Sequence, residues 1–214
     1  MDFDSRVEAG QRLAEALGRY RGEEDVVVLG LPRGGVVLAA EVARELQAPL
    51  GVVIVQKIGH PSSPEYAIGA LAEDLAPVYN EQEAAGIDPS WLARAEASAR
   101  GANRKRSESY YDEGLAPLEM GGRSAIVVDD GMATGLTMEA AARLLLSRGA
   151  RQVVVAVPVA SPESVTRLQP VADEVLVLDQ PDHFGSAVGT HYRQFEQIDD
   201  AEVKTLLWEV NAGV

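Results

Sequence analysis

Two adjacent acids followed by a run of small residues are the part of this sequence best suited to chemistry. Asp129 and Asp130 come directly after the apolar run Ala125–Val128. Residues 131–135 then form a glycine-rich turn, and apolar positions recur at helical spacing from Met138. A short run rich in β-branched residues predicts a buried strand, and the later spacing predicts a helix. We therefore expect a strand, an acidic pair, a loop and a helix, in that order.

This order suits a ligand that carries an anionic group. A loop that enters a helix presents free backbone N–H groups beside the positive end of the helix dipole. Gly131 and Gly135 let the backbone approach a phosphate closely, while Thr134 and Thr137 add hydroxyl donors. Carboxylates beside such a cradle, at the carboxyl end of a strand, suit a ligand that also has a diol or a metal. The stretch is neither a Walker A loop, because no Gly-Lys-Ser/Thr follows, nor a GxGxxG loop.

The stretch Ile126–Thr137 resembles the phosphoribosyl pyrophosphate (PRPP) motif of the type I phosphoribosyltransferases. That motif has apolar residues, two acids, a spacer, and then a small residue, Thr, Gly, any residue and Thr, and every fixed position is present here. The resemblance implies that Asp129 and Asp130 bind the ribose hydroxyls. It also implies that one loop holds the 5′-phosphate, made of Ala133, Thr134, Gly135, Leu136 and Thr137. The alternative is a capped helix preceded by a turn and two incidental acids.

A second strand, glycine loop and helix come earlier in the chain. The apolar run 26–29 is followed by Gly-Leu-Pro-Arg-Gly-Gly and then by a helical pattern. Backbone N–H groups together with Arg33 suit a pyrophosphate, although an ordinary turn between strand and helix is the alternative. In the family that the chain resembles, a pyrophosphate loop at this place ends in Arg-Gly-Gly or Lys-Gly-Gly. The resemblance therefore assigns Arg33, Gly34 and Gly35 to pyrophosphate, and implies that the Pro32–Arg33 peptide is strained or cis.

A lysine follows the third apolar run. Residues 50–55 are all apolar, so we expect a strand in the centre of the sheet. Lys57 then lies at its carboxyl end, the edge where open α/β sheets bind ligands. A solvated lysine at a strand end is the alternative. Members of the family often have a basic residue here near the pyrophosphate, so the resemblance adds Lys57 to the pyrophosphate-binding residues.

The next segments are expected to cover the site. The first half of 58–74 is rich in Gly, Pro and Ser, which predicts a long loop, and the family closes a flexible lid loop at this place. His60 and Tyr66 are candidates in that lid, with no role assigned. The charged stretch of about 80–116 predicts a helical insertion. Its basic cluster Arg100–Arg106 is either a solvated helix end, a patch that faces a ligand, or a subunit contact.

The resemblance implies a hood over the acceptor, formed by about 179–214. Such hoods often hold the acceptor base by aromatic stacking, for which Phe184 or Tyr192 is available. In the alternative reading, the same two aromatic residues only pin their loop to the body of the protein. The hood matches no family pattern closely, so the acceptor stays open.

Composition narrows the class of protein. The chain has 214 residues, of which 46% are hydrophobic, enough for one sizeable domain. Its net charge of −14 disfavours nucleic acid and anionic membranes as partners. There is no cysteine, which excludes disulfides and Cys-ligated metal. The first residues lack the features of a signal peptide, and no apolar run approaches the ~20 residues that span a bilayer. We expect a cytoplasmic protein.

These observations predict one α/β domain over 1–214, with a core of about 26–178. The core is a Rossmann-like parallel sheet with helices on both faces, joined by the small hood and the lid loop. The implied reaction transfers 5-phosphoribosyl from PRPP to a nitrogen acceptor, with a nucleobase favoured, and releases pyrophosphate. The resemblance implies a requirement for Mg²⁺, which Asp129 and Asp130 reach through water. The catalytic residues are then Asp129, Asp130, Lys57 and Arg33.

The alternative function is a sensor or regulator that binds PRPP or a nucleotide without turnover. Its partners would be PRPP or a nucleotide alone, whereas the enzyme would also need a small-molecule acceptor. Formation of a homo-oligomer is left open.

Overall fold

The computed structural model describes residues 2–73, 75–111, 116–185 and 187–213. Its centre is a five-stranded parallel sheet in the order β2-β1-β6-β7-β8. The strands are β1 (Val26–Gly30), β2 (Leu50–Val52), β6 (Ser124–Val128), β7 (Gln152–Val159) and β8 (Glu174–Asp179). Every residue of β1 and β6 is buried, which explains why these strands are continuous apolar runs rather than alternating patterns.

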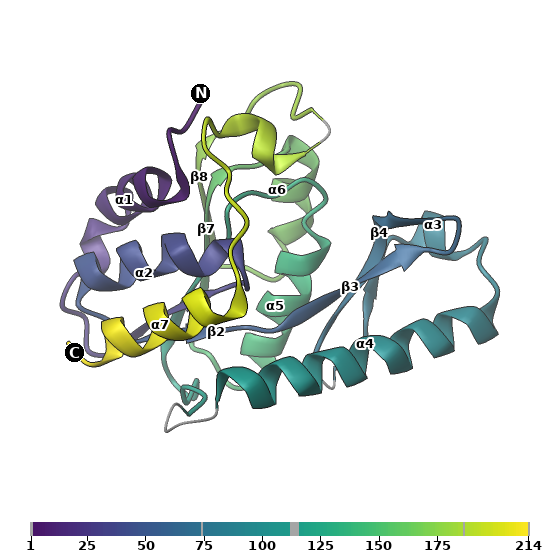
Figure 1. The fold of residues 1–214 in the computed structure, drawn as a ribbon, viewed down its shortest axis with the longest axis horizontal. Helices are drawn as coiled ribbons and strands as arrows, with labels where there is room; N and C mark the ends of the chain where they lie inside the picture. The colour runs from purple at the N-terminus through teal and green to yellow at the C-terminus, as the bar shows by residue number, and fades with distance from the viewer. Residues whose placement is uncertain (1, 74, 112–115, 186, 214) are drawn as a thin grey trace.

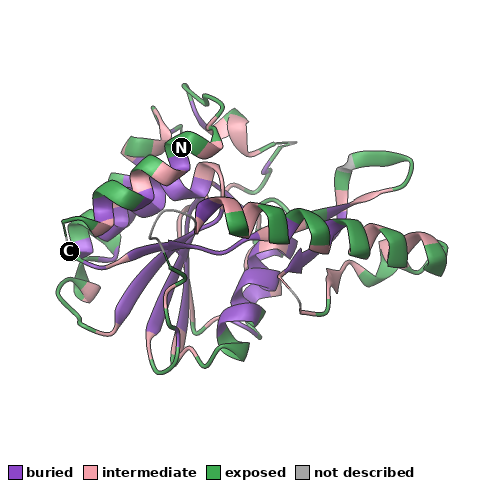
Figure 2. Ribbon diagram, turned by 60° about the horizontal axis from the view of Figure 1, so that its bottom comes forward, coloured by how far each residue is buried: buried purple, intermediate pink, exposed green. Residues whose placement is uncertain are grey.

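Helices cover both faces of this sheet, as Figures 1 and 2 show. One face carries α1 (Arg6–Ala16), α2 (Gly34–Leu46) and α7 (Asp200–Asn211), and the other carries α5 (Leu136–Ser147) and α6 (Pro162–Leu168). Successive strand residues point to opposite faces, so Val26 and Val28 of β1 join the first core while Val27 and Leu29 join the second. The predicted α/β fold with a parallel sheet is confirmed. Short 3-10 helices occur at Gly18–Tyr20 and Val188–His191.

A second, smaller unit is inserted after β2, and we call residues 55–110 the extension. It consists of the antiparallel strands β3 (Val55–His60), β4 (Ser63–Ala72) and β5 (Val78–Tyr79), and of the helices α3 (Glu81–Ala84) and α4 (Pro89–Tyr110). Figure 1 shows it projecting away from the parallel sheet, with α4 running along it. Its own core is small, because only Ile58, Ile68, Leu71 and Ala99 are buried in that cluster. The predicted insertion extends to 116, and 112–115 lie outside the described residues.

The prediction that residues 50–55 form a central strand is wrong. β2 ends at Val52 and lies at the edge of the parallel sheet. Its apolar residues are covered by other elements instead of by a second neighbouring strand. The Asn211 side chain of α7 accepts from Leu50 N at 3.0 Å and donates to Leu50 O at 2.9 Å, and the Tyr111 hydroxyl donates to Val52 O at 3.1 Å. An edge strand covered in this way has the same apolar composition as a central one.

The predicted lid loop is instead a β-hairpin, formed by β3 and β4. Glycine and proline usually indicate a loop, but here they have local roles within the hairpin. Pro61 and Ser62 form the turn, and the strand register shifts on both sides of Gly59. A Cβ on Gly59 would lie 2.0 Å from Pro64 O, so the irregular pairing requires glycine there.

The segment predicted as the hood divides into two parts. Residues 188–195 stay near the end of β6, whereas α7 packs against α2 and β2 on one face of the sheet. The C-terminal helix therefore belongs to the core and does not cover the predicted site. Within the part of the chain that the structure describes, no helix is both long and apolar enough to cross a membrane.

Candidate active site at the carboxyl edge of the parallel sheet

Asp129 and Asp130 lie where β6 ends, at the edge where the carboxyl ends of the parallel strands meet. The chain is held there by the neighbouring segments, since Leu31 N donates to Val128 O at 3.0 Å and Met132 N donates to Val159 O at 2.9 Å. Asp130 N donates to Asp129 Oδ1 at 2.9 Å, which fixes the first carboxylate against the backbone. Backbone contacts with two neighbouring segments therefore hold the turn that carries the acids, and the Asp129 carboxylate is bonded within that turn.

An arginine that sequence reasoning missed contacts the second acid. Arg6 Nε, in the first turn of α1, donates to Asp130 Oδ2 at 2.9 Å, and the two side chains are only 10% and 16% exposed. Arg6 Nη1 also donates to Glu196 O at 2.6 Å, and the guanidinium lies 3.7 Å from the centre of the Phe195 ring. One weak signal was available: a cation in the first turn opposes the helix dipole, so Arg6 needs another reason to be there.

The two glycines of the earlier loop pack directly against the acids. A Cβ on Gly34 would lie 2.1 Å from Asp130 Oδ2, and a Cβ on Gly35 would lie 2.9 Å from Asp129 Oδ1. Larger residues would push the carboxylates away from the start of α2. The structure thus brings together the two sequence motifs that are predicted to share a ligand. The Pro32–Arg33 peptide in this loop is cis, as expected.

Burial dominates the electrostatics of the acid pair. It raises the pKa of Asp129 well above its usual value, and the neighbouring Asp130 charge raises that pKa further. Burial also raises the pKa of Asp130, but the Arg6 charge and hydrogen bond oppose this rise. Lys57 lowers the pKa of both carboxyls, so its charge acts on the acid pair even though its side chain is exposed on β3.

The predicted phosphate loop is an open turn that precedes α5. Gly135 has a φ of +75°, a left-handed conformation that favours glycine, and Ala133 and Thr134 are exposed. Two serines at the start of α6 donate hydrogen bonds to carbonyl groups of the loop. Ser161 Oγ donates to Ala133 O at 2.7 Å, and Ser164 Oγ donates to Met132 O at 3.1 Å. The first-turn N–H groups of α5 have no acceptor within the helix, as at any helix start, so they suit an anion.

Arg33 does not contact the acids through any interaction found among the described residues. Arg33 is the residue before α2. Burial and Asp200 raise the pKa of Tyr110, and the charge of Arg33 opposes this rise. Its side chain therefore acts near the end of α4. Of the predicted pyrophosphate residues, Gly34 and Gly35 pack against the acid pair and the charge of Lys57 acts on it, whereas the charge of Arg33 acts on Tyr110.

Phe184 and Tyr192 are buried, which contradicts their predicted role as a stacking platform for an acceptor base. They are only 8% and 7% exposed. The Tyr192 hydroxyl donates to Asp130 O at 2.6 Å, and its ring packs against Phe3 and Phe195. The Phe184 ring packs against His191. Both rings hold their loop against the body of the protein, as in the alternative reading, and no open ring face is left for a ligand.

The other candidates lie in the extension. His60 Nδ1 is 2.9 Å from Ser62 Oγ across the hairpin turn, and the exposed Tyr66 donates to Glu83 Oε1 at 3.2 Å. In the basic cluster, Arg100 Nη2 donates to Leu75 O at 3.0 Å and so ties α4 to the segment after β4. These contacts are structural, so the structure gives none of the three residues a role in the chemistry.

The oxygen donors at the acid pair fit a magnesium ion. Among the described residues, no group of three or more His, Cys, Asp or Glu side chains converges as a metal site. Magnesium is commonly bound through one or two carboxylates while water and substrate phosphates supply its other ligands. Asp129 and Asp130 satisfy that pattern, with one oxygen of Asp130 already bonded to Arg6.

Comparison with known proteins agrees with this geometry. A family model described as a phosphoribosyl transferase domain matches residues 4–194. The crystal structure of TT1426 from Thermus thermophilus is 47% identical, with a TM-score of 0.80, and the match covers 98% of this chain and 99% of that chain. A "Hypothetical Protein from Neisseria gonorrhoeae with bound ppGpp" shares the fold at 15% identity and a TM-score of 0.50, over 98% of both chains.

A curated relative is longer than this chain. The "Putative phosphoribosyl transferase Rv0571c" of Mycobacterium tuberculosis is 43% identical over 207 residues, which are 96% of this chain and 46% of the relative. This chain therefore spans about half the length of the curated relatives that it matches.

Proposed function

Because this chain belongs to the phosphoribosyltransferase family, we propose that it transfers the 5-phosphoribosyl group of PRPP to a nitrogen acceptor and releases pyrophosphate. One observation carries the proposal. The acid pair lies within van der Waals reach of the glycine pair Gly34-Gly35 at the same sheet edge as the open loop before α5. This arrangement offers a diol site between two anion sites, as PRPP requires.

In this proposal each part of PRPP has its own protein groups. The 5′-phosphate accepts from the amides of the loop 133–137 and from the Thr134 and Thr137 hydroxyls. The ribose hydroxyls donate to Asp129 and Asp130. The pyrophosphate lies at the start of α2, where the Gly34 and Gly35 amides, Lys57 and Arg33 neutralise it.

The reaction breaks the bond between C1 of the ribose and the pyrophosphate oxygen, and a bond from the acceptor nitrogen to C1 replaces it. Positive charge develops on the ribose as the first bond breaks, so fixed carboxylates beside it interact more strongly with the transition state than with the ground state. This interaction requires ionised carboxylates. Burial raises the pKa of both carboxyls, whereas the charges of Arg6 and Lys57 lower it. Mg²⁺ bound by Asp129 and Asp130 through water would stabilise the negative charge of the leaving pyrophosphate.

The acceptor is proposed to be a nucleobase or a related nitrogen compound. Its recognition has to use groups other than the rings of Phe184 and Tyr192, because both are buried. A ring nitrogen attacks without a strong general base, so the lack of a base in the predicted set does not oppose the reaction.

A sensor that binds PRPP without turnover is the second candidate. The observation that favours it is the Arg6–Asp130 ion pair, because this contact already neutralises one of the two ribose-binding carboxylates. The two candidates share the PRPP site and differ only in whether the bond at C1 breaks.

Two measurements test the proposal. PRPP with Mg²⁺ at 100 times its dissociation constant should stabilise the fold by about 2.7 kcal/mol, seen as a rise in Tm. Pyrophosphate release from PRPP is then measured with a panel of nucleobases and amines. A rise in Tm with no release from any acceptor would favour the sensor, whereas no rise at millimolar PRPP would contradict both candidates.

A further inference from the structure

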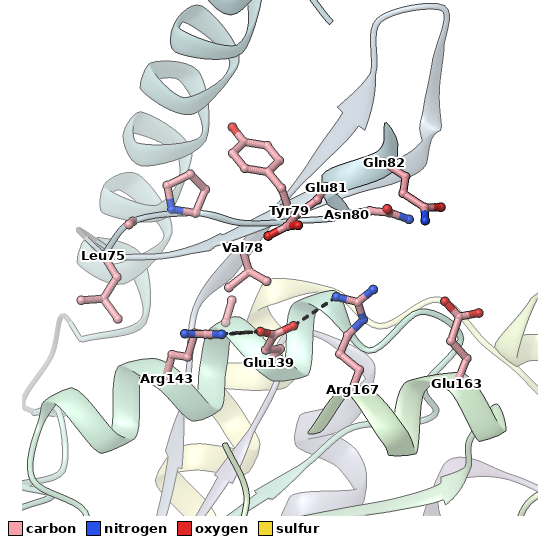
Figure 3. Close-up of a pocket in the computed structure, with 13 residues that line it drawn as sticks. Leu75, Val78, Tyr79, Asn80, Glu81, Gln82, Glu139, Arg143, Glu163 and Arg167 are labelled. Atoms are coloured by element: carbon pink, nitrogen blue, oxygen red, sulfur yellow. Dashed lines mark hydrogen bonds and ion pairs between the residues drawn. The ribbon is translucent and has the colours of Figure 1, made fainter. Parts of the chain in front are cut away.

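A cavity of about 850 Å³ lies away from the acid pair, between the segment 75–82 of the extension and the helices α5 and α6. Figure 3 shows that segment on one side and the side chains of the two helices on the other. None of the residues that line the cavity belongs to the predicted PRPP-binding set. A volume in the range of about 300–1,000 Å³ is usual for small-molecule sites, so the cavity is large enough for a metabolite.

The helix side of this cavity carries two arginines that share one acid. Arg143 donates to Glu139 Oε1 through Nε at 3.0 Å and Nη2 at 2.8 Å, and Arg167 Nη1 lies 3.3 Å from Glu139 Oε2 (Figure 3). Glu139 is buried, Arg167 is largely buried and Arg143 is half exposed. Two guanidinium charges against one carboxylate leave this group with a net charge of +1.

Arg167 is incompletely satisfied in this group. Its Nε is buried and has no hydrogen-bond partner among the described residues, and the contact of its Nη1 with Glu139 is long, at 3.3 Å. Leaving a buried donor unpaired costs roughly 1–3 kcal/mol. In a chain with a net charge of −14, two guanidinium groups that share one carboxylate at a cavity wall form a locally positive surface, which suits an external anion.

The opposite wall supplies neutral polar groups. Asn80 and Gln82 line the cavity with side-chain amides, which donate and accept hydrogen bonds. Glu81 and Glu163 also line it, but both are exposed, so water and salt screen their charges more than those of the buried group. The cavity therefore combines an anion-binding wall with amides that suit an uncharged polar body.

We propose that this cavity is a second small-molecule site, which binds a phosphate group through Arg143 and Arg167. A phosphate offers three acceptor oxygens, enough to bond to the guanidinium groups of both arginines. The ligand source is either free phosphate or a phosphorylated metabolite such as a sugar phosphate or nucleotide, since both carry the same group. This proposal does not depend on the transferase reaction.

The site is physically connected to the predicted phosphate loop. Arg167 Cδ would lie 3.3 Å from a Cβ on Gly135, so its stem packs on the residue that precedes α5. Glu139 N donates to Gly135 O at 2.8 Å. Because Arg167 and Glu139 both contact Gly135, their variants need loop variants as a comparison.

The test is a binding measurement, made by calorimetry with inorganic phosphate, ribose 5-phosphate and adenosine 5′-monophosphate as probes. Wild type should bind at two sites per chain. Arg167→Gln and Arg143→Gln should remove one site, and Thr134→Val combined with Thr137→Val should weaken the other. Arg151→Gln is the matched control, because Arg151 also pairs with an acid, Asp25, but lies outside the cavity. An unchanged number of sites in Arg167→Gln would overturn the proposal.

A second variant covers the case in which an arginine variant fails to fold. Glu139→Gln keeps both arginines but removes the carboxylate that competes for them, so we expect phosphate to bind on the order of tenfold more tightly at the cavity. A merely structural ion pair would give no such gain, and unchanged or weaker binding in the folded variant would contradict the site. If free phosphate binds as tightly as the two larger probes, the amide wall takes no part and the ligand is the inorganic ion. None of these readouts requires turnover, so they can fail while the transferase proposal holds.

Discussion

The acid-pair site and the cavity both place carboxylates beside arginines, but with opposite charge balance. At the sheet edge two adjacent acids have one arginine beside them, Arg6, which pairs with Asp130, whereas in the cavity two arginines pair with Glu139. We therefore expect the first site to favour a diol or a developing positive charge, and the second to favour an anion. The difference shows that the residue types alone do not define a site, because the ratio of charges and their burial decide which ligand each site favours.

The two sites also differ in how they are built. Backbone segments at the ends of parallel strands position the acids, and the glycine pair leaves room for them. Side chains from α5 and α6 build the cavity wall, opposite a segment of the extension, whose own buried core is small. We therefore expect substitutions at the sheet edge to act on chemistry, and substitutions in the cavity to act on binding of a separate ligand.

We expect the largest effect from a substitution of Asp130, which belongs to the sheet-edge site and not to the cavity. Asp130→Asn removes one preorganised charge that acts in the transition state, so kcat should fall on the order of 10²-fold, about 2.7 kcal/mol, with a smaller change in KM. Steady-state pyrophosphate release measures this. Asp25→Asn, on an acid at the opposite end of the sheet that pairs with Arg151, is the control. An unchanged kcat would refute the role given to Asp130.

Asp129→Asn should stabilise the protein at neutral pH. Folding raises the pKa of this carboxyl, so the folded state binds more protons than the unfolded state between the ordinary and the raised pKa, and stability falls as pH rises through that window. Removing the charge should recover about 1.4 kcal/mol for each pKa unit of the shift. Urea denaturation from pH 8 down to pH 5 tests this. The gain should shrink on acidification, and a gain that is independent of pH would contradict the cause.

Arg6→Gln should change the pH dependence of the reaction. Arg6 lowers the pKa of Asp130, so its loss should raise that pKa and move the acidic limb of the kcat/KM profile to higher pH. We expect a loss of roughly tenfold in kcat/KM at neutral pH, about 1.4 kcal/mol. Arg6→Lys should restore part of the profile, because it keeps the charge without the fixed geometry. A uniform loss at every pH would show that Arg6 has only a structural role. Phosphate binding in the cavity should be unaffected.

The smallest effect is expected from the phosphate loop. Thr137→Val removes a hydroxyl that we propose to hold the 5′-phosphate throughout the reaction, so KM should rise by roughly threefold to tenfold while kcat changes little. Arg143→Gln is the comparison from the cavity, and KM for PRPP should stay within about twofold of wild type because the substitution is outside the loop. Equal increases in KM for both variants would show that the two sites are not separate.

Much of the fold could be predicted because it depends on neighbouring residues. The apolar runs 26–29 and 125–128 and the helical pattern from Met138 each carry their own local signal, and each lies in a strand or helix as expected. The errors arose where one composition fits two structures. An apolar run fits an edge strand covered by α7 as well as a central strand, and Gly and Pro fit a hairpin with a register shift as well as a loop.

The candidate site likewise has parts that the local sequence predicts and parts that it does not. The sequence by itself determined the acid pair, the glycine-containing turn before α5 and the glycine pair, because each is a contiguous motif whose shape depends on local backbone preferences. Only the tertiary structure decided that Arg6 pairs with Asp130 across 124 residues, and that Tyr192 is buried with its hydroxyl on Asp130 O. It likewise decided that Arg143 and Arg167 meet at Glu139. The physical reason is that such contacts depend on how helices and strands pack together, and spacing along the chain does not encode that packing.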